Sequence, residues 1–109
     1  MHGLIVTYGV NPLDRIQHAE FVSEIAPALA AVLGLVSRTP LENESTGRFG
    51  AFSLFESKEA FDRFVASELY AAIGSHRTVK ALQASEFSVH PRREPVARRR
   101  AAVAGGGCA

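Results

Sequence analysis

Two histidines and two tyrosines are the side chains of this sequence best suited to proton transfer. His18 lies four residues after Asp14 and three before Phe21, so it shares one face of a predicted helix with apolar side chains. An imidazole in this place can serve as a pocket base or a haem ligand, because its pKa lies near physiological pH. The alternative is a histidine at the margin of the apolar stripe, hydrogen-bonded or half exposed.

The other histidine and one tyrosine follow in the second half of the chain. His76 comes shortly after Gly74, where it can act as an acid or base at a pocket mouth or can simply be a solvated loop residue. Tyr70 is predicted near the end of the second helix, where its hydroxyl could orient a phenolic substrate, although tyrosine more often packs as an amphipathic group. We therefore predict His18, Tyr70 and His76 as catalytic candidates.

Three further residues are predicted to bind substrate. Tyr8 lies on the first predicted strand, and its hydroxyl could orient a phenol or could be a packing group. Arg38, on the second, could hold an anionic substrate or stabilise an enolate-like oxygen, unless it is a solvated edge-strand residue. Phe52, on the third, completes this set. The histidines show no zinc-motif spacing, so no metal site is predicted.

Charge and composition narrow the class of protein. The 109 residues fit one domain with a net charge of +1. Residues 1–90 carry seven basic and ten acidic side chains, whereas residues 91–109 carry five arginines and one glutamate. A mildly acidic body disfavours nucleic-acid binding. The longest apolar run, residues 25–36, contains a proline and a glycine and is too short to span a membrane. The single cysteine, Cys108, favours a cytoplasmic location.

Hydrophobic periodicity predicts six elements. Strands are expected over residues 4–10, 35–42, 48–55 and 78–89, and helices over residues 14–33 and 57–75. Asp14 and Ser57 are expected to cap the helices, Pro27 to kink the first helix or start a new one, and Gly34 to stop it. Pro40 places the second strand at a sheet edge. In the last strand, Val79 and Phe87 are expected on the same side.

This order, β-α-β-β-α-β, predicts an α+β fold of the ferredoxin-like type, with a four-stranded antiparallel sheet over residues 1–91. Right-handed crossovers place the first and third strands in the centre. Both are apolar on both faces, yet two helices cover only one face. At about 25 cal/mol per Å², a bare face of several hundred Å² forgoes on the order of ten kcal/mol. A homodimer through the sheet face solves this. Residues 92–109 are predicted to be disordered.

Four segments carry a resemblance to a known family. They are Ile25–Leu29, Gly34–Leu35, Glu42–Ser45 and Gly50–Phe55. Over residues 4–90 the chain resembles the dimeric α/β-barrel superfamily and, within it, the YdhR-type putative mono-oxygenases. The resemblance implies a small homodimer with a pocket between each sheet and its helices. Antibiotic-biosynthesis relatives oxidise phenolic or quinol-like aromatics with dioxygen and no added cofactor, whereas others bind haem or isomerise lactones.

The leading prediction is therefore a cofactor-independent mono-oxygenase acting on a small aromatic, quinol-like molecule. The sequence contains no tryptophan and no tight catalytic motif. This leaves open a non-catalytic dimer that binds haem or another small ligand, and a structural dimer without ligand. A pocket of about 300 Å³ or more would count against the last of these.

Overall fold

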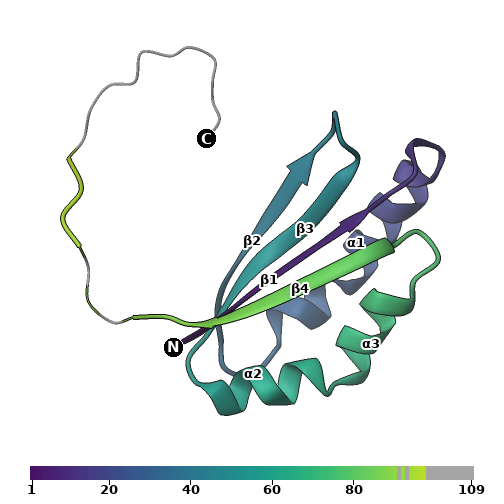
Figure 1. The fold of residues 1–109 in the computed structure, drawn as a ribbon. Coiled ribbons are helices and arrows are strands. Elements are labelled where there is room, and N and C mark those ends of the chain that lie inside the picture. The colour runs from purple at the N-terminus through teal and green to yellow at the C-terminus, as the bar shows by residue number, and fades with distance from the viewer. Residues whose placement is uncertain (91, 93, 98–109) are drawn as a thin grey trace.

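Four strands form one antiparallel sheet in the order β2-β3-β1-β4 (Figure 1). The computed structural model describes residues 1–90, 92 and 94–97. The strands are β1 His2–Gly9, β2 Leu35–Asn43, β3 Arg48–Phe55 and β4 Lys80–Ser88. The central positions of β1 and β3 and the edge position of β2, which contains Pro40, confirm the predicted sheet. Residues 92–109 are predicted to be disordered. Residues 93 and 98–109 of this segment lie outside the described part of the chain, so the disorder stays a prediction.

The helices of the described residues all lie on one side of this sheet, and none of them covers the other side (Figure 1). They are a short 3-10 turn Pro12–Asp14, α1 Arg15–Ala30, α2 Lys58–Val65 and α3 Glu68–Ser75. The element order and the single helical layer confirm the ferredoxin-like fold. No helix in the described part of the chain is long and apolar enough to cross a membrane.

The start and end of α1 differ from the prediction in instructive ways. Asp14 makes no side-chain capping bond; instead the side chain of Asn11 accepts a hydrogen bond from the Leu13 amide and starts the 3-10 turn. The helix does not restart at Pro27 but continues through it, with the proline exposed. The helix ends at Ala30, four residues before Gly34, so Gly34 does not stop it as predicted. Gly34 instead adopts a φ of +82° in the turn that leads into β2.

The predicted second helix is wrong as a single element, because it is broken between Val65 and Glu68. Ser67 has an extended backbone, and its Oγ accepts a hydrogen bond from the Tyr70 amide, with 3.2 Å between the nitrogen and the oxygen. A serine side chain that caps a new helix competes with continuation of the old one. Tyr70 therefore stands in the first turn of α3 instead of near a helix end.

Side chains alternate between the two faces of the sheet. The face toward the helices carries the core, and its buried members on the central strands are Leu4, Val6, Tyr8, Ala51, Ser53 and Phe55. The open face carries Ile5, Phe52 and Leu54, all half-buried in the protomer. A bulge near the start of β4 changes the face of the sheet on which its side chains lie.

The bulge lies at Ala81, which has a φ of +50°, and it shifts the register between Thr7 and Gly9. An extra residue in one strand reverses the alternation beyond it. Val79 is consequently buried in the core, whereas Phe87 lies opposite Gly3 and is 53% exposed. The prediction that these two side chains share one side of the strand is wrong for this reason.

Candidate functional site

A cavity with two chambers lies between the helices and the sheet. The inner chamber holds about 30 Å³, roughly enough for one water molecule, and the outer chamber holds about 380 Å³. Tyr8, Val22, Arg38 and Gly50 line both. The outer volume falls in the range of ligand sites. Its size counts against a purely structural protein without a ligand.

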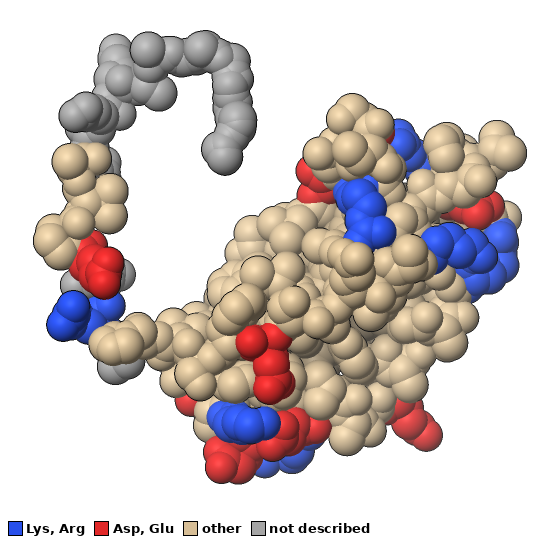
Figure 2. Space-filling view, viewed as in Figure 1, with Lys and Arg blue, Asp and Glu red and all other residues tan. Residues whose placement is uncertain are grey.

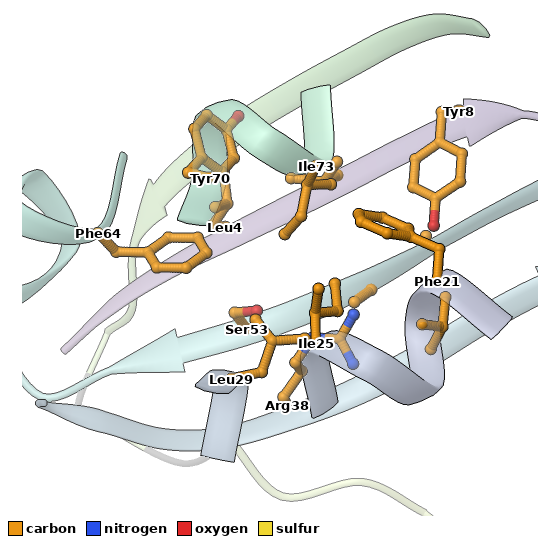
Figure 3. A pocket seen from close by; sticks show the side chains of 14 residues that line it. Leu4, Tyr8, Phe21, Ile25, Leu29, Arg38, Ser53, Phe64, Tyr70 and Ile73 are labelled. Atoms are coloured by element: carbon orange, nitrogen blue, oxygen red, sulfur yellow. The ribbon is translucent and has the colours of Figure 1, made fainter. Parts of the chain in front are cut away.

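The inner chamber is mostly apolar and runs along the sheet (Figure 3). Phe64 and Tyr70 stand at one end, Tyr8 and Phe21 at the other, and Arg38 enters from β2 (Figure 3). The Tyr70 ring packs edge-on against Phe64 at 5.3 Å between centroids. Burial raises the pKa of Tyr70, so its phenol stays neutral at physiological pH.

A chain of hydrogen bonds begins at the wall between the chambers. The Tyr8 hydroxyl lies 3.1 Å from Nε2 of His18, and Nδ1 of His18 lies 3.1 Å from the Thr78 hydroxyl. That hydroxyl lies 2.8 Å from Nδ1 of His76. Tyr8, His18 and Thr78 are buried, and His76 is half-buried. Both nitrogens of His18 are therefore occupied by protein partners.

Burial sets the charge state of the first two members of this chain. It lowers the pKa of His18, and the nearby His76 lowers it further. Burial also raises the pKa of Tyr8, against a smaller opposing effect of the Arg38 guanidinium. At neutral pH the two groups form an uncharged pair, and the uncharged His18 can accept a proton.

Arg38 supplies positive charge to the cavity. Burial lowers its pKa and the neighbouring Tyr8 acts in the opposite direction, but a guanidinium stays charged at physiological pH. Among the described residues no carboxylate forms an ion pair with it, whereas Arg15, on the outer chamber, lies 4.0 Å from Glu44. A half-buried cation without an acidic partner is suited to an anionic or carbonyl oxygen.

The structure thus brings most of the predicted site residues together at the two chambers and places the others outside them. Tyr8, His18 and Arg38 meet at the outer chamber, and Tyr70 lines the inner one. His76 belongs to neither wall; its ring stacks on Phe21 with centroids 3.8 Å apart. Phe52 pairs with Ile5 on the opposite face of the sheet, so the structure removes it from this cavity. The cause is the alternation of side chains along β3.

Thr78 is the member of the site that sequence reasoning missed. It lies at the approach to β4 and is 60 residues from His18, to which it is hydrogen-bonded. No spacing rule links positions so far apart. The only signal was its place two residues after His76, and threonines just before a strand are common.

Comparisons with known proteins agree with this fold. A family model described as putative mono-oxygenase YdhR matches residues 10–98. No curated protein is significantly similar to the sequence.

Several solved structures share the fold. A putative antibiotic biosynthesis monooxygenase from Deinococcus radiodurans is 17% identical, with a TM-score of 0.74 over 89% of this chain and 100% of that one. A second such protein, from Caulobacter crescentus, is 18% identical, with a TM-score of 0.67 over 82% and 90% of the two chains. The heme-degrader MhuD from Mycobacterium tuberculosis, solved with two hemes in its active site, is 19% identical, with a TM-score of 0.64 over 86% and 100%.

Proposed function

The chain belongs to the YdhR family of putative mono-oxygenases, and we propose that it oxidises a small phenolic or quinol-like aromatic with dioxygen and without an added cofactor. One observation carries the proposal. A neutral Tyr8–His18 pair and the guanidinium of Arg38 line the same mainly apolar chamber of about 380 Å³. A base beside a cation is what the conversion of a phenol to a phenolate needs.

In this reaction the protein binds and deprotonates the substrate. Apolar walls hold the aromatic ring, Arg38 pairs with the phenolate oxygen, and the Tyr8–His18 pair takes the proton. The electron-rich anion then reduces dioxygen. For an anthrone-type substrate, one oxygen atom replaces two hydrogens at carbon to give the quinone, and the other leaves as water.

The direct test is oxygen consumption by the purified protein with a panel of anthrones, anthrols and hydroquinones. We expect uptake that depends on enzyme concentration and gives the quinone in equal amount to the oxygen consumed. A heat-treated sample is the control. Uptake no faster than this control for every substrate would contradict the proposal.

The pH profile offers a second prediction. A protonated His18 cannot accept a proton, so activity should fall on the acidic side as His18 becomes charged. Because burial and His76 lower the pKa of His18, this fall should lie below about 6.5, the ordinary histidine value. The other titratable groups on the outer chamber are Tyr8, Arg15, Arg38, Glu42 and Glu44. Initial rates measured across the acidic range check this; a midpoint above the ordinary value would contradict it.

Haem binding is the alternative suggested by the heme-degrader of similar fold. The residues of this chain do not fit that role well. Tyr8 and Thr78 are hydrogen-bonded to the two nitrogens of His18, so neither nitrogen is free to bind a haem iron. We therefore favour the reaction without haem. Titration with haem should leave the Soret spectrum of free haem essentially unchanged.

We also propose that the protein is a homodimer through the open face of the sheet. Ile5, Phe52 and Leu54 are only half-buried there, and Phe87 is 53% exposed. Figure 2 shows a mostly uncharged surface between the charged groups at the two ends of the molecule. A second copy would cover this apolar face by a two-fold contact.

A charge added to this face should separate the subunits. We expect a dimer at micromolar concentration for the unmodified protein and a monomer for Phe87→Arg, because burying an unpaired guanidinium in an apolar interface is costly. Leu13→Arg is the matched control, since Leu13 is 91% exposed near the helices. Sedimentation velocity checks all three. A monomeric unmodified protein would refute the proposed dimer.

The single cysteine also supports a cytoplasmic location, which we propose on that basis.

A further inference from the structure

We propose that Tyr8, His18, Thr78 and His76 form a path that carries a proton from the outer chamber to the surface, with Thr78 as its positioning residue. This inference rests on the proposed function, in which a proton leaves the substrate before dioxygen reacts and a proton returns when the product water forms. The Tyr8–His18 pair can accept the substrate proton but is buried. A link to the surface lets the pair release the proton while substrate fills the outer chamber.

Three of the four groups are buried and the last is not, as such a path needs. Tyr8 is 6% exposed, His18 7% and Thr78 0%, and each is hydrogen-bonded to its neighbour in the chain. His76 is only half-buried and rests on the ring of Phe21. The chain therefore starts at the chamber wall and ends at a side chain that water can reach.

The direction of each bond follows from one backbone group. The Thr78 amide can only donate, and it lies 3.3 Å from Nδ1 of His76. Nδ1 of His76 must then be an acceptor, which leaves the proton of this neutral ring on Nε2. The Thr78 hydroxyl consequently donates to His76 and accepts from Nδ1–H of His18. Nε2 of His18 is left to accept from the Tyr8 hydroxyl.

All bonds of the chain therefore point from the chamber toward the surface. The substrate hydroxyl gives its proton to the Tyr8 oxygen as the Tyr8 proton passes to Nε2 of His18. The Nδ1 proton of His18 passes to the Thr78 oxygen, and the Thr78 hydroxyl proton passes to Nδ1 of His76. The Nε2 proton of His76 then leaves to water. Each residue keeps its number of protons, the substrate becomes an anion, and nothing is oxidised or reduced in this step. The bonds of the chain are then reversed, and the proton that returns from water when the product water forms restores their first direction.

The charges around the path favour this direction. At the chamber end, the Arg38 guanidinium disfavours a second positive charge and stabilises the substrate anion that remains. Arg15, Glu42 and Glu44 also line the outer chamber. At the surface end, Arg77, next to His76 in sequence, is paired with Asp14 at 3.6 Å. This pairing offsets its positive charge beside the residue that must carry the proton.

The path can be tested in the protein without substrate. With nitrogen-labelled histidine, NMR should find His18 protonated on Nδ1 and His76 on Nε2. Exchange of the His18 ring proton with water should slow about tenfold or more in His76→Asn, which keeps an acceptor for Thr78 but cannot pass the proton on. Thr78→Ser should exchange like the unmodified protein. The opposite tautomers, or unchanged exchange in His76→Asn, would overturn the proposal.

Activity supplies a second readout. Thr78→Val, which keeps the shape but removes the hydroxyl, should lower kcat about tenfold or more with little change in KM, and Thr78→Ser should restore it. Added imidazole should partly rescue His76→Asn, as the lost group lies at the surface. Absence of these effects in an active enzyme would overturn the path. If the unmodified protein consumes no oxygen, the proposed function fails, and the exchange measurements still decide the path.

Discussion

His18→Gln should lower kcat for oxygen consumption by a factor of about 10² to 10³. A glutamine can still exchange hydrogen bonds with Tyr8 and Thr78, so the buried contacts are largely kept. It cannot accept a proton, and the substrate phenol would have to ionise without a base. The expected loss therefore measures proton transfer and not a failure to fold.

The matched control for this variant is the neighbouring residue on the same helix. Gln17 is exposed and lines neither chamber, so Gln17→Ala should leave kcat unchanged. Circular dichroism and thermal melting should show native-like folding for both variants. Activity of His18→Gln within about threefold of the unmodified protein would exclude His18 as the base.

Gly50→Ala should destabilise the protein by several kcal/mol, on the order of 3, because it disrupts the central strand pair. A Cβ on Gly50 would lie well inside van der Waals contact of the Val6 carbonyl oxygen on the adjacent strand. Backbone atoms at the centre of a sheet cannot move aside without loss of ladder hydrogen bonds. Gly50 also lines both chambers, so the variant should weaken ligand binding too.

A second glycine gives a control with the opposite expected sign. Gly74 lies inside α3, and a Cβ there would meet only the tip of Leu82 at 4.0 Å. Gly74→Ala should raise the free energy of unfolding by about 0.5–1 kcal/mol, because alanine loses less backbone entropy in a helix. Urea unfolding of the two variants at one protein concentration makes the comparison. Equal effects would show that strand contact at Gly50 is not the cause.

The sheet was the most predictable part of this protein. Strand β3 has the predicted bounds, and Pro40 correctly placed β2 at an edge. These features depend on alternation and on the missing amide of proline, which are local properties. The break before α3 was missed because Ser67 stands in a sequence that otherwise continues a helical pattern. Whether such a serine caps a new helix depends on what that helix packs against.

The site was predictable in its parts but not in its connections. Tyr8, His18 and Arg38 were identified by residue type on predicted elements, and these elements meet at one chamber. Phe52 was assigned to the same wall although it alternates to the other face of β3. The link from His18 to Thr78 joins distant positions, and only the packing of α1 against the turn before β4 creates it.

The guanidinium of Arg38, which forms no ion pair with a carboxylate in the described part of the chain, has a consequence for selectivity. A molecule that fills the chamber but offers Arg38 no oxygen leaves that cation shielded from water without compensation. Sites of this kind reject an analogue that lacks one polar atom far more strongly than one that lacks a methyl group. Plain arenes should thus be poor competitors against hydroxylated rings of the same size, and the protein should sort aromatic molecules by their oxygen atoms before it sorts them by shape.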